Sequence, residues 1–515
     1  MLQIKNVTLV HKKDLRTLLS DFSLVLNSGD KAVIIGEEGN GKSTLLKWIY
    51  NPALTESYAE AAGERVLGGE TLAYLPQELP EHCKKLSVLE FFAEYEGFYD
   101  LTYDELRRKA KKAGLAQDIY YSEQIMGTLS GGEKIKIQLL RLLLADPAVL
   151  LLDEPSNDID IKTLEWLEKL ICSWKGIVLF ISHDEVLIEK TANVVIHLEQ
   201  IYRKRESRSG VFRMSYREYM EQRAQRFIRQ EQQAVWERKE KQLRDEKFRK
   251  IVQRVEHEQK TISRGDPHGG RLLKKKMHTV KAMERRFEKQ DARMTKMPII
   301  ESAMNIRLNP EVQSVPAGKT VLDFSLDCLI VPETKRILSE NIHLTIKGSK
   351  KICIVGANGV GKTTLLRLIS RELLDRKDIQ AGYMPQNYEE KLDMTMTPVD
   401  FLNKSGTAEE QVKICNFLGA LRYTAEEMSH AIRELSGGQK AKLLLLQMML
   451  NGDNVLILDE PTRNFSPLSG GAIRELLGSF TGAIISVSHD RKYIDEVCEE
   501  IYELRPEGLV ELNNR

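Results

Sequence analysis

Cysteine is scarce in this chain, and neither a long apolar run nor a signal-peptide core is found in it. The six cysteines among 515 residues are scattered, and no two of them form a CxxC pair. This spacing excludes a zinc or iron–sulfur framework of the usual kind and suits a reducing compartment. No run approaches the roughly 18–20 apolar residues that a membrane helix requires. We therefore expect a cytoplasmic location and no membrane domain.

Proline and glycine are missing from two long runs in the middle of the chain. They are absent from residues 215–261, return together as RGDPHGG at 264–270, and are absent again from 271–297. Good helix formers dominate both runs, so we expect two helices with a turn at Ser263–Gly270. Sparse apolar residues, spaced by three, four or seven positions, give each helix one face that suits a partner helix. These residues are Phe248, Val252, Val255, Ile262, Leu273, Met277, Val280, Phe287 and Met294.

The same part of the chain concentrates positive charge. Residues 201–296 contain 29 Lys and Arg against 14 Asp and Glu, a local charge of +15, whereas the whole chain carries +1. A strongly basic segment in acidic surroundings points to a polyanionic partner. Two simpler interpretations stay open at this stage, a solvated charged helix and a disordered basic linker.

The sequence on either side of this basic stretch repeats one set of motifs in the same order. The pattern GxxxxGK[ST] occurs at 36–43 and at 356–363, each time after a short apolar run and before a helical one. YLPQ and YMPQ, LSGGE and LSGGQ, VLLLDEP and VLILDEP, and SHD twice complete the two copies. From the LSGG motif onward the copies are offset by a constant 306 residues. Matched motifs at matched spacing indicate a duplicated nucleotide-binding domain.

These observations predict an α/β fold with two P-loop ATPase domains joined by a long antiparallel two-helix linker. We expect the first domain at 1–200, the linker at 201–298 with its tip at 263–272, and the second domain at 299–515. The first copy is longer, since Gly36 and Gln77 are 41 residues apart whereas Gly356 and Gln386 are 30 apart. We expect the additional residues near 56–69.

The chemistry of phosphoryl transfer explains why these residue types recur. A glycine-rich loop lets the backbone wrap phosphates, its lysine contacts phosphate oxygens, and its Ser or Thr binds Mg²⁺. Acids that directly follow a buried apolar strand are costly unless a cation shares them. We therefore expect Asp153 and Asp459 to serve Mg²⁺, and the adjacent Glu154 and Glu460 to polarise the attacking water.

The motif set resembles the ATPase domain of ABC proteins, with Walker A, glutamine loop, LSGGQ signature, Walker B and switch histidine. Two fused domains of this type, with no membrane domain and a charged helical linker, resemble the ABC-F family. Members of that family bind the ribosome from the tRNA exit-site side, with the linker pointing at the peptidyl-transferase centre. EPTRNFSPLS at 460–469 resembles the antibiotic-resistance branch, whereas housekeeping members more often read EPTNHLD there.

The resemblance implies an ATP hydrolase that uses ATP and Mg²⁺ and acts as a monomer whose two ATPase domains pair within the chain. It further implies a ribosome partner, with contacts to 23S rRNA near the peptidyl-transferase centre and to exit-site tRNA, and protection of translation from antibiotics. A housekeeping ABC-F translation factor is the main alternative. A twin ATPase subunit of a membrane importer and a DNA-associated ATPase also stay open, because phosphate contacts do not separate RNA from DNA.

The motifs identify the residues that we expect to act. The catalytic candidates are Glu154, Glu460, His183 and His489. The candidates for binding ATP are Gly36, Gly39, Gly41, Lys42, Ser43, Thr44, Gln77, Ser130, Gly131, Gly132, Gly356, Gly359, Gly361, Lys362, Thr363, Thr364, Gln386, Ser436, Gly437 and Gly438. The candidates for Mg²⁺ are Ser43, Gln77, Asp153, Thr363, Gln386 and Asp459. The candidates for contact with rRNA or a drug site are Arg264, His268, Arg271, Leu272, Lys274, Lys275 and Lys276.

By the same resemblance, each signature caps the ATP that is bound by the other domain. Site one then combines Lys42, Asp153 and Glu154 with Ser436 and Gly438. Site two combines Lys362, Asp459 and Glu460 with Ser130 and Gly132.

Two departures make the sites unequal. Walker A of the first copy has Glu37 and Glu38 where the second has Ala and Asn, and acid near the triphosphate should weaken ATP binding unless it turns away. Asp160 of the first copy is replaced by Ser466 in the second. An aromatic residue that stacks on adenine is not assigned in either copy.

Overall fold

The computed structural model describes residues 1–157, 159–201, 206–261, 267–292, 294–295, 297, 314–331 and 336–512. Residues 1–216 and 301–515 form one compact unit, and residues 217–300 form a second one. Below, cassette one denotes residues 1–216, cassette two denotes residues 301–515, and the hairpin denotes residues 217–300.

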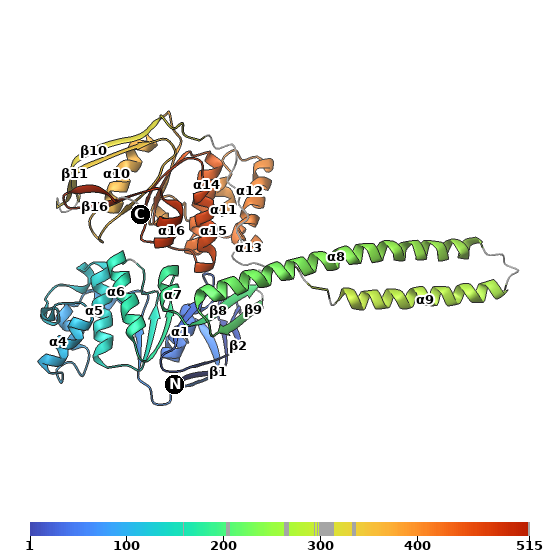
Figure 1. Cartoon of the computed structure of the whole chain (residues 1–515), viewed down its shortest axis with the longest axis horizontal. Helices are drawn as coiled ribbons and strands as arrows, with labels where there is room; N and C mark the ends of the chain where they lie inside the picture. The colour runs from blue at the N-terminus through green and yellow to red at the C-terminus, as the bar shows by residue number, and fades with distance from the viewer. Residues whose placement is uncertain are drawn as a thin grey trace. The chain divides into compact units, whose positions relative to one another are not determined.

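Each cassette contains a six-stranded sheet, and the two sheets have the same strand order (Figure 1). In cassette one the order is β5 (Leu72–Leu75), β6 (Val149–Asp153), β7 (Ile177–Ile181), β3 (Lys31–Ile35), β8 (Val194–Ile201) and β9 (Glu206–Phe212). In cassette two it is β13 (Ala381–Met384), β14 (Val455–Asp459), β15 (Ala483–Val487), β12 (Lys351–Val355), β16 (Glu500–Arg505) and β17 (Gly508–Leu512). All neighbours are parallel except the last pair in each sheet, which is antiparallel. The central strands are mostly apolar and fully buried, as strands covered on both faces are.

A smaller antiparallel sheet accompanies each large one. In cassette one it has three strands, β1 (Leu2–His11), β2 (Thr17–Leu26) and β4 (Ala59–Val66). In cassette two it has two, β10 (Thr320–Ile330) and β11 (Ile337–Lys347). Strand β4 lies within the additional residues of the first copy and pairs with β1, so the insertion adds an edge strand.

Helices cover the sheets and form a small helical subdomain in each cassette. In cassette one they are α1 (Lys42–Tyr50), α2 (Glu81–Lys84), α3 (Val88–Ala93), α4 (Tyr103–Lys112), α5 (Gly131–Leu144), α6 (Ile161–Ser173) and α7 (Glu185–Thr191). In cassette two they are α10 (Lys362–Leu374), α11 (Pro398–Leu402), α12 (Ala408–Ala420), α13 (Ala425–Ser429), α14 (Gly437–Asn451), α15 (Pro467–Gly478) and α16 (Arg491–Val497). Short 3₁₀ turns lie at Pro52–Leu54, Gln117–Tyr121, Met126–Thr128, Tyr388–Glu390 and Ile432–Glu434.

The boundary expected at residue 200 differs from the structure. Strand β9 pairs with β8 along its whole length, so it completes the large sheet of cassette one. The strand lies at the edge of the sheet, so its sequence is mostly polar and its residues are exposed or half-buried. Because of this polar composition, the sequence placed it in the linker. The boundary expected at 298–299 falls among residues 298–313, outside the described residues.

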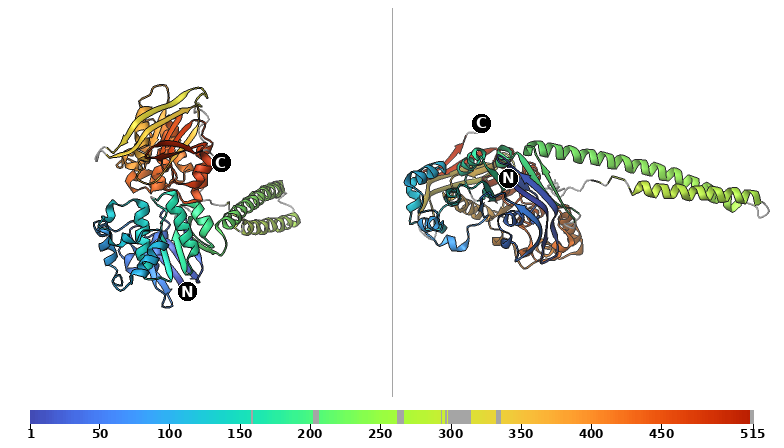
Figure 2. Two further views of the ribbon diagram at one scale, coloured as in Figure 1. Left: turned by 60° about the vertical axis from the view of Figure 1, so that its left-hand side comes forward. Right: turned by 90° about the horizontal axis from the view of Figure 1, so that it is seen from below.

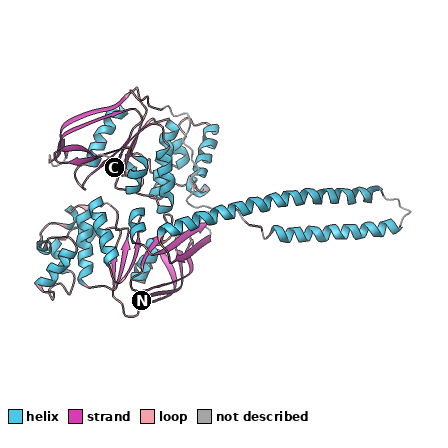
Figure 3. Ribbon diagram, viewed as in Figure 1, coloured by secondary structure: helices cyan, strands magenta, loops and turns pink. Residues whose placement is uncertain are grey.

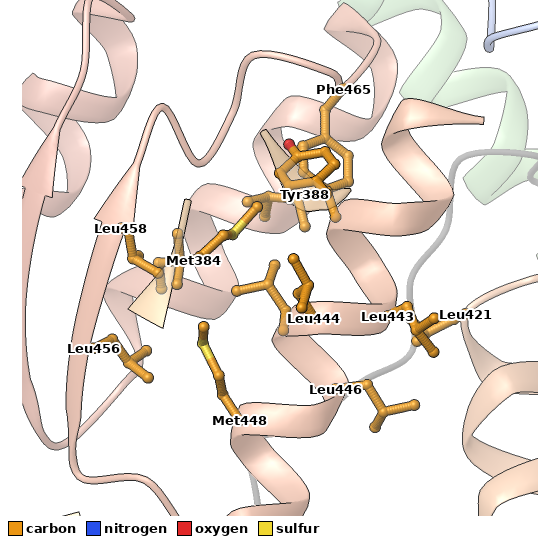
Figure 4. Close-up of a cluster of buried hydrophobic side chains, with 14 of the residues drawn as sticks. Met384, Tyr388, Leu421, Leu443, Leu444, Leu446, Met448, Leu456, Leu458 and Phe465 are labelled. Carbon is orange, nitrogen blue, oxygen red and sulfur yellow. The ribbon is translucent and has the colours of Figure 1, made fainter. Parts of the chain in front are cut away.

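The core of cassette two joins the end of the sheet to the helical subdomain (Figure 4). Met384 and Leu458 are paired near the ends of two neighbouring strands, and Leu444 of α14 belongs to the same buried cluster. Tyr388 and Phe465 belong to this cluster too, and they follow Gln386 and Glu460 closely in sequence. The segments that carry these two polar residues are thereby anchored by buried side chains.

The hairpin consists of α8 (Tyr216–Thr261) and α9 (Pro267–Asp291), which lie side by side in each view (Figures 2 and 3). The rings of Phe248 and Phe287 meet edge to face with centroids 5.4 Å apart, and Val255 and Val280 are buried. The predicted pairing of the apolar faces is confirmed at these residues. Of the other expected residues, Ile262 and the side chain of Leu273 lie outside the described residues.

Ion pairs flank this apolar contact and fix the antiparallel register of the helices. Arg244 Nη2 lies 2.5 Å from Asp291 Oδ1, and Lys276 Nζ donates to Glu258 Oε2 at 2.6 Å. The guanidinium of Arg244 also stacks over the Phe287 ring at 4.5 Å. An ordered two-helix element, rather than a disordered linker, follows from these contacts.

The extent of the turn differs from the expectation of 263–270. Helix α9 begins at Pro267, so Pro267–Gly270 are helical, and so is the rest of the expected tip up to residue 272. Proline interrupts a helix from inside but favours its first position, where φ is already suitable and no N–H is needed. Pro267, which we expected in the turn after the first helix, is therefore the first residue of α9.

Within the described part of the chain, none of the helices combines the length and the apolar composition needed to cross a membrane.

Candidate functional site

The two glycine-rich loops connect a buried strand to a helix in the same way in each cassette. Lys42 and Lys362 are the first residues of α1 and α10. Gly36 has a φ of +151°, and a Cβ there would lie 2.3 Å from the carbonyl oxygen of Leu198, so only glycine fits. Lys42 Nζ donates to the carbonyl of Gly36 at 2.8 Å, and Lys362 Nζ donates to that of Gly356 at 2.9 Å.

In cassette one, side chains from four segments gather at the end of β6. Ser43 Oγ donates to Asp153 Oδ1 at 2.8 Å. Gln77 Nε2 donates to Glu154 Oε2 at 2.8 Å, and His183 Nε2 lies 3.1 Å from Glu154 Oε1. The structure therefore brings together the predicted Walker A, glutamine-loop, Walker B and switch residues of site one.

Electrostatics at Glu154 favours the carboxylate. Burial by itself would raise its pKa, but the hydrogen bond and charge of His183 outweigh burial and lower the pKa to about 2. The pKa of His183 is raised despite burial, because Glu154 stabilises the protonated ring. The two groups thus form a partly buried ion pair, with side chains about a tenth exposed.

Both predicted catalytic acids have an unusual backbone. Glu154 has φ +51° and Glu460 has φ +53°, in the left-handed region that non-glycine residues seldom adopt. The backbone N–H of each still bonds across to the neighbouring strand, to Ile181 in one case and Val487 in the other. This turn after the strand directs the two acids alike, and such strain commonly marks functional positions.

Site two has the same parts in a looser arrangement. His489 Nε2 lies 3.8 Å from Glu460 Oε1, and the backbone N–H of His489 donates to Glu460 Oε2 at 3.3 Å. Burial, followed by the charge of Asp459, raises the pKa of Glu460 to about 8. Burial raises the pKa of Asp459 to about 6 and lowers that of His489 to about 4. The charge of Lys362 lowers the pKa of both carboxyl groups, but burial outweighs it.

The residues at the strand ends fit a magnesium ion. Asp459 is the last residue of β14, and within the described residues neither of its buried carboxylate oxygens has a hydrogen-bond partner of good geometry. Thr363, the second residue of α10, offers a hydroxyl on the same side of the sheet. In site one the corresponding pair, Ser43 and Asp153, is already in contact. Carboxylate and hydroxyl oxygens are the ligands that Mg²⁺ takes in nucleotide sites.

Site two is a cavity shared by the two cassettes. The cavity has a volume of about 1020 Å³, and Lys362, Thr363, Gln386 and His489 of cassette two line it. Ser130 of cassette one lines the same cavity and is the N-cap of α5, with a capping box that fixes the start of that helix. A helix N-terminus that faces a lysine and a glycine-rich loop suits a triphosphate.

In site one the two acids of Walker A contact cassette two. Glu38 Oε2 accepts a hydrogen bond of 3.1 Å from the backbone N–H of Gly438 in the signature. Glu37 Oε1 accepts from the hydroxyls of Ser466 and Ser469, at 2.7 Å each. The expected weakening of ATP binding therefore concerns Glu38 more than Glu37. Glu37 faces the opposite cassette, whereas Glu38 occupies a backbone N–H of the signature.

Sequence reasoning missed two groups that the structure places at the sites. The hydroxyl of Tyr74 donates to Asp153 Oδ2 at 3.1 Å, and its counterpart in the YxPQ motif, Tyr383, has its pKa raised to about 12 by burial and Asp459. Arg336 lines the site-two cavity, and its counterpart Arg16 donates to the carbonyl of Gly39 at 3.1 Å. The sequence could have indicated these residues, because each pair occupies the same position in the two copies of the repeat.

The candidates for rRNA or drug contact are only partly described. Arg264 and the side chain of His268 lie outside the described residues, whereas Arg271 and Leu272 are exposed on α9. Lys274, Lys275 and Lys276 are exposed there too, and Lys276 bonds to Glu258.

Two P-loop cassettes, each offering its signature helix to the nucleotide loop of the other, define the class of paired ABC-type ATPases. The family model described as "ABC transporter" matches residues 19–157 and 339–463, and the chain belongs to that family. It is therefore an ATP hydrolase of the ABC type. Domains of this type generally bind ATP with Mg²⁺.

The similar proteins are named as ATP-binding proteins and as ABC transporter F family members. The chain is 27% identical to "Probable ATP-binding protein YheS" of Escherichia coli K12, over 95% of this chain and 77% of the relative. It is 26% identical to "ABC transporter F family member 2" of Arabidopsis thaliana, over 96% of this chain and 75% of the relative.

Among solved structures, the complex of archaeal ribosomal stalk protein aP1 and ribosome recycling factor aABCE1 matches with a TM-score of 0.57 at 15% identity. That match covers 98% of this chain and 90% of the other. At this identity the match supports the fold.

Proposed function

We propose that this chain is a ribosome-binding ATPase that presents its basic hairpin to 23S rRNA near the peptidyl-transferase centre and protects translation there from antibiotics. The observation that carries the proposal is the hairpin itself. Phe248 pairs with Phe287 and Val255 and Val280 are buried between α8 and α9, while residues 201–296 carry a net +15. A rigid, basic two-helix element is suited to phosphate-rich RNA, which is read largely through shape and backbone.

The relatives are consistent with this proposal. They include ABC transporter F family members, and two solved structures of similar fold are of a ribosome recycling factor and of a ribosome-bound complex. The sequence EPTRNFSPLS at 460–469 supports the antibiotic-protection branch, and its residues Ser466 and Ser469 donate hydrogen bonds to Glu37. A cytoplasmic site of action and a contact with exit-site tRNA follow from the same proposal.

In the proposed cycle, ATP bound in both sites holds the cassettes closed and the ribosome-bound state persists until hydrolysis. Lys42 and Lys362 hold phosphate oxygens, and the signatures at Ser130 and Ser436 cap the nucleotides from the opposite side. Mg²⁺ bound at Asp153 and Asp459 would neutralise charge on the transferring phosphoryl group. Release of phosphate removes ligands from both sides of the interface, so the closed state loses its support.

Glu154 and Glu460 then act as the groups that polarise the attacking water, with His183 and His489 beside them. The carboxylate of Glu154 is already oriented by Gln77 and His183, so little rearrangement is needed at site one.

The test is a comparison of full-length wild-type protein with the Glu154→Gln/Glu460→Gln variant in ribosome sedimentation with ATP. We expect the variant to sediment with ribosomes and wild-type expression to reduce susceptibility to drugs of the peptidyl-transferase centre, such as lincosamides or pleuromutilins. Ribosome binding without protection from any such drug would favour the housekeeping alternative. Binding to membranes in place of ribosomes would overturn the proposal in favour of an ATPase subunit of a membrane importer. Binding to DNA in place of ribosomes would favour a DNA-associated ATPase.

A further inference from the structure

Outside the nucleotide sites, α6 and α7 of cassette one meet α15 and α16 of cassette two through buried ion pairs. Arg491 Nη1 lies 2.5 Å from Glu168 Oε1, and Arg474 Nη1 donates to Glu185 Oε1 at 2.8 Å. The side chains of Glu168 and Glu185 are each 9% exposed, and that of Arg474 is 6% exposed. Ion pairs at this depth are not the weak, solvent-screened kind.

The two pairs are equivalent by the internal repeat. The constant offset of 306 residues places Arg474 at the position of Glu168 and Arg491 at the position of Glu185. Each pair therefore joins the same two positions of the fold, taken once from each cassette. In both pairs the acid belongs to cassette one and the base to cassette two.

The side chains that support these pairs are inverted in the same way. Within cassette one, Lys190 Nζ donates to Glu168 Oε2 at 3.0 Å. Within cassette two the equivalent residue, Glu496, accepts from Arg474 Nε at 2.6 Å. A third equivalent position with opposite charge is difficult to explain by chance, so the charges of the two surfaces form one complementary set.

One further base extends the set. Lys492 Nζ donates to Glu185 Oε2 at 2.9 Å and to Glu189 Oε1 at 2.6 Å, whereas the equivalent residue of cassette one is Val186. Arg491 also donates to Asp184 Oδ1 at 2.8 Å. The acids Glu168, Asp184, Glu185 and Glu189 thus all face bases of cassette two.

The contact beside site one also joins side chains that would not match if two copies of the same cassette met. Glu37 accepts from Ser466 and Ser469 of cassette two. The equivalent of Ser466 in cassette one is Asp160, which would place a carboxylate against Glu37 if two copies of cassette one met. Ala357, the equivalent of Glu37, leaves Asp160 without that conflict in the observed pairing.

We propose that these charges form a recognition code that selects cassette two of the same chain as the partner of cassette one and excludes pairing between like cassettes. Two copies of cassette one would oppose Glu168 to Glu185, and two copies of cassette two would oppose Arg474 to Arg491. Buried like charges are strongly repulsive, so specificity comes from the rejected pairs as much as from the accepted one. The occupant of the surface is the second cassette, and the code adds to the closure that ATP gives, because none of these ion pairs includes Walker A or signature residues.

The experiment exchanges equivalent side chains between the cassettes of the full-length chain. One variant carries Glu168→Arg, Glu185→Arg, Val186→Lys and Lys190→Glu, a second carries Arg474→Glu, Arg491→Glu, Lys492→Val and Glu496→Lys, and a third carries all eight. Spin labels at Tyr99→Cys and Val412→Cys, both at exposed positions, report the distance between cassettes by pulsed electron resonance with a non-hydrolysable ATP analogue. Cys172, Cys328 and Cys415 are replaced by Ser in every variant, and Arg505→Glu, which loses an ion pair within cassette two, is the matched control.

We expect one narrow distance population in wild type and control, its loss in both half-exchanges, and its return in the full exchange. If a half-exchange does not fold, recovery of a cooperative melting transition in the full exchange shows the same rescue. A half-exchange that keeps the wild-type distance, or a full exchange that does not restore it, would overturn the proposal. Light scattering gives the mass in parallel, and a dimeric wild type would overturn the assignment of the partner to the same chain.

Discussion

Nδ1 of His183 in cassette one donates a hydrogen bond of 2.6 Å to the backbone carbonyl oxygen of Phe465 in cassette two. The other ring nitrogen of the same histidine faces Glu154, and the Phe465 side chain is buried in the core of cassette two. The predicted switch residue of site one is thus tied to both cassettes. In site two, Nδ1 of His489 is buried and has no partner of good geometry among the residues that the structure describes, so the two switch histidines have different contacts.

The double substitution Glu154→Gln/Glu460→Gln should stop turnover while ATP binding persists. Glutamine keeps the shape of glutamate but does not polarise water as a carboxylate does, and general-base contributions are typically on the order of 100- to 10,000-fold. Phosphate release measures turnover, and a fluorescent ATP analogue measures binding. Undiminished hydrolysis by the double variant would refute the role assigned to both acids.

The single substitutions Glu154→Gln and Glu460→Gln should differ in residual ATPase rate. Glu154 is held by Gln77, Asn157 and His183, whereas Glu460 has a longer contact with His489. We therefore expect Glu154→Gln to remove the larger share of turnover, because its site is better organised. Equal residual rates would mean that the geometric difference has no kinetic consequence.

Replacing Glu38 by the residue of the second copy, Glu38→Asn, should tighten ATP binding at site one. The carboxylate of Glu38 occupies the N–H of Gly438, which a phosphate oxygen would otherwise use, and it adds like charge. One such contact is worth about 1 kcal/mol, or roughly fivefold in Kd. Nucleotide titration of Glu38→Asn beside Glu60→Asn, an exposed acid on β4, tests this, and identical affinities would show that Glu38 leaves the site when ATP binds.

Reversal of charge on the hairpin, with Lys274→Glu, Lys275→Glu and Lys276→Glu together, should weaken ribosome binding and reduce its salt dependence. Each phosphate contact contributes about 0.7–0.9 to the slope of log affinity against log salt, so loss of three lowers the slope by about 2–3. Basal ATPase should not change. Lys276→Glu alone is the control for the internal pair with Glu258, and an unchanged slope in the triple variant would leave these lysines as a solvated surface.

Most of the fold was predictable because the motifs carry their own structural context. A glycine-rich loop after KAVII or KICIV requires a strand, a turn and a helix, and duplication at constant offset repeats that requirement. The pairing of Phe248 and Val255 with the second helix was predictable from spacing. Strand β9 was not, since a polar edge strand has no periodic signal distinct from a linker, and neither was the helical start at Pro267.

The sequence by itself determined which residues to expect at each nucleotide site, because phosphate, magnesium and water each require a particular residue type at a particular strand or helix end. Only the tertiary structure showed which residues are contacted at the positions where the two copies differ. Glu37 contacts Ser466 and Ser469, and Glu168 meets Arg491, only because two copies of one fold meet face to face across 306 residues of sequence. Local pattern cannot show such contacts, since the position of a charge in the chain does not say which charge will oppose it in space.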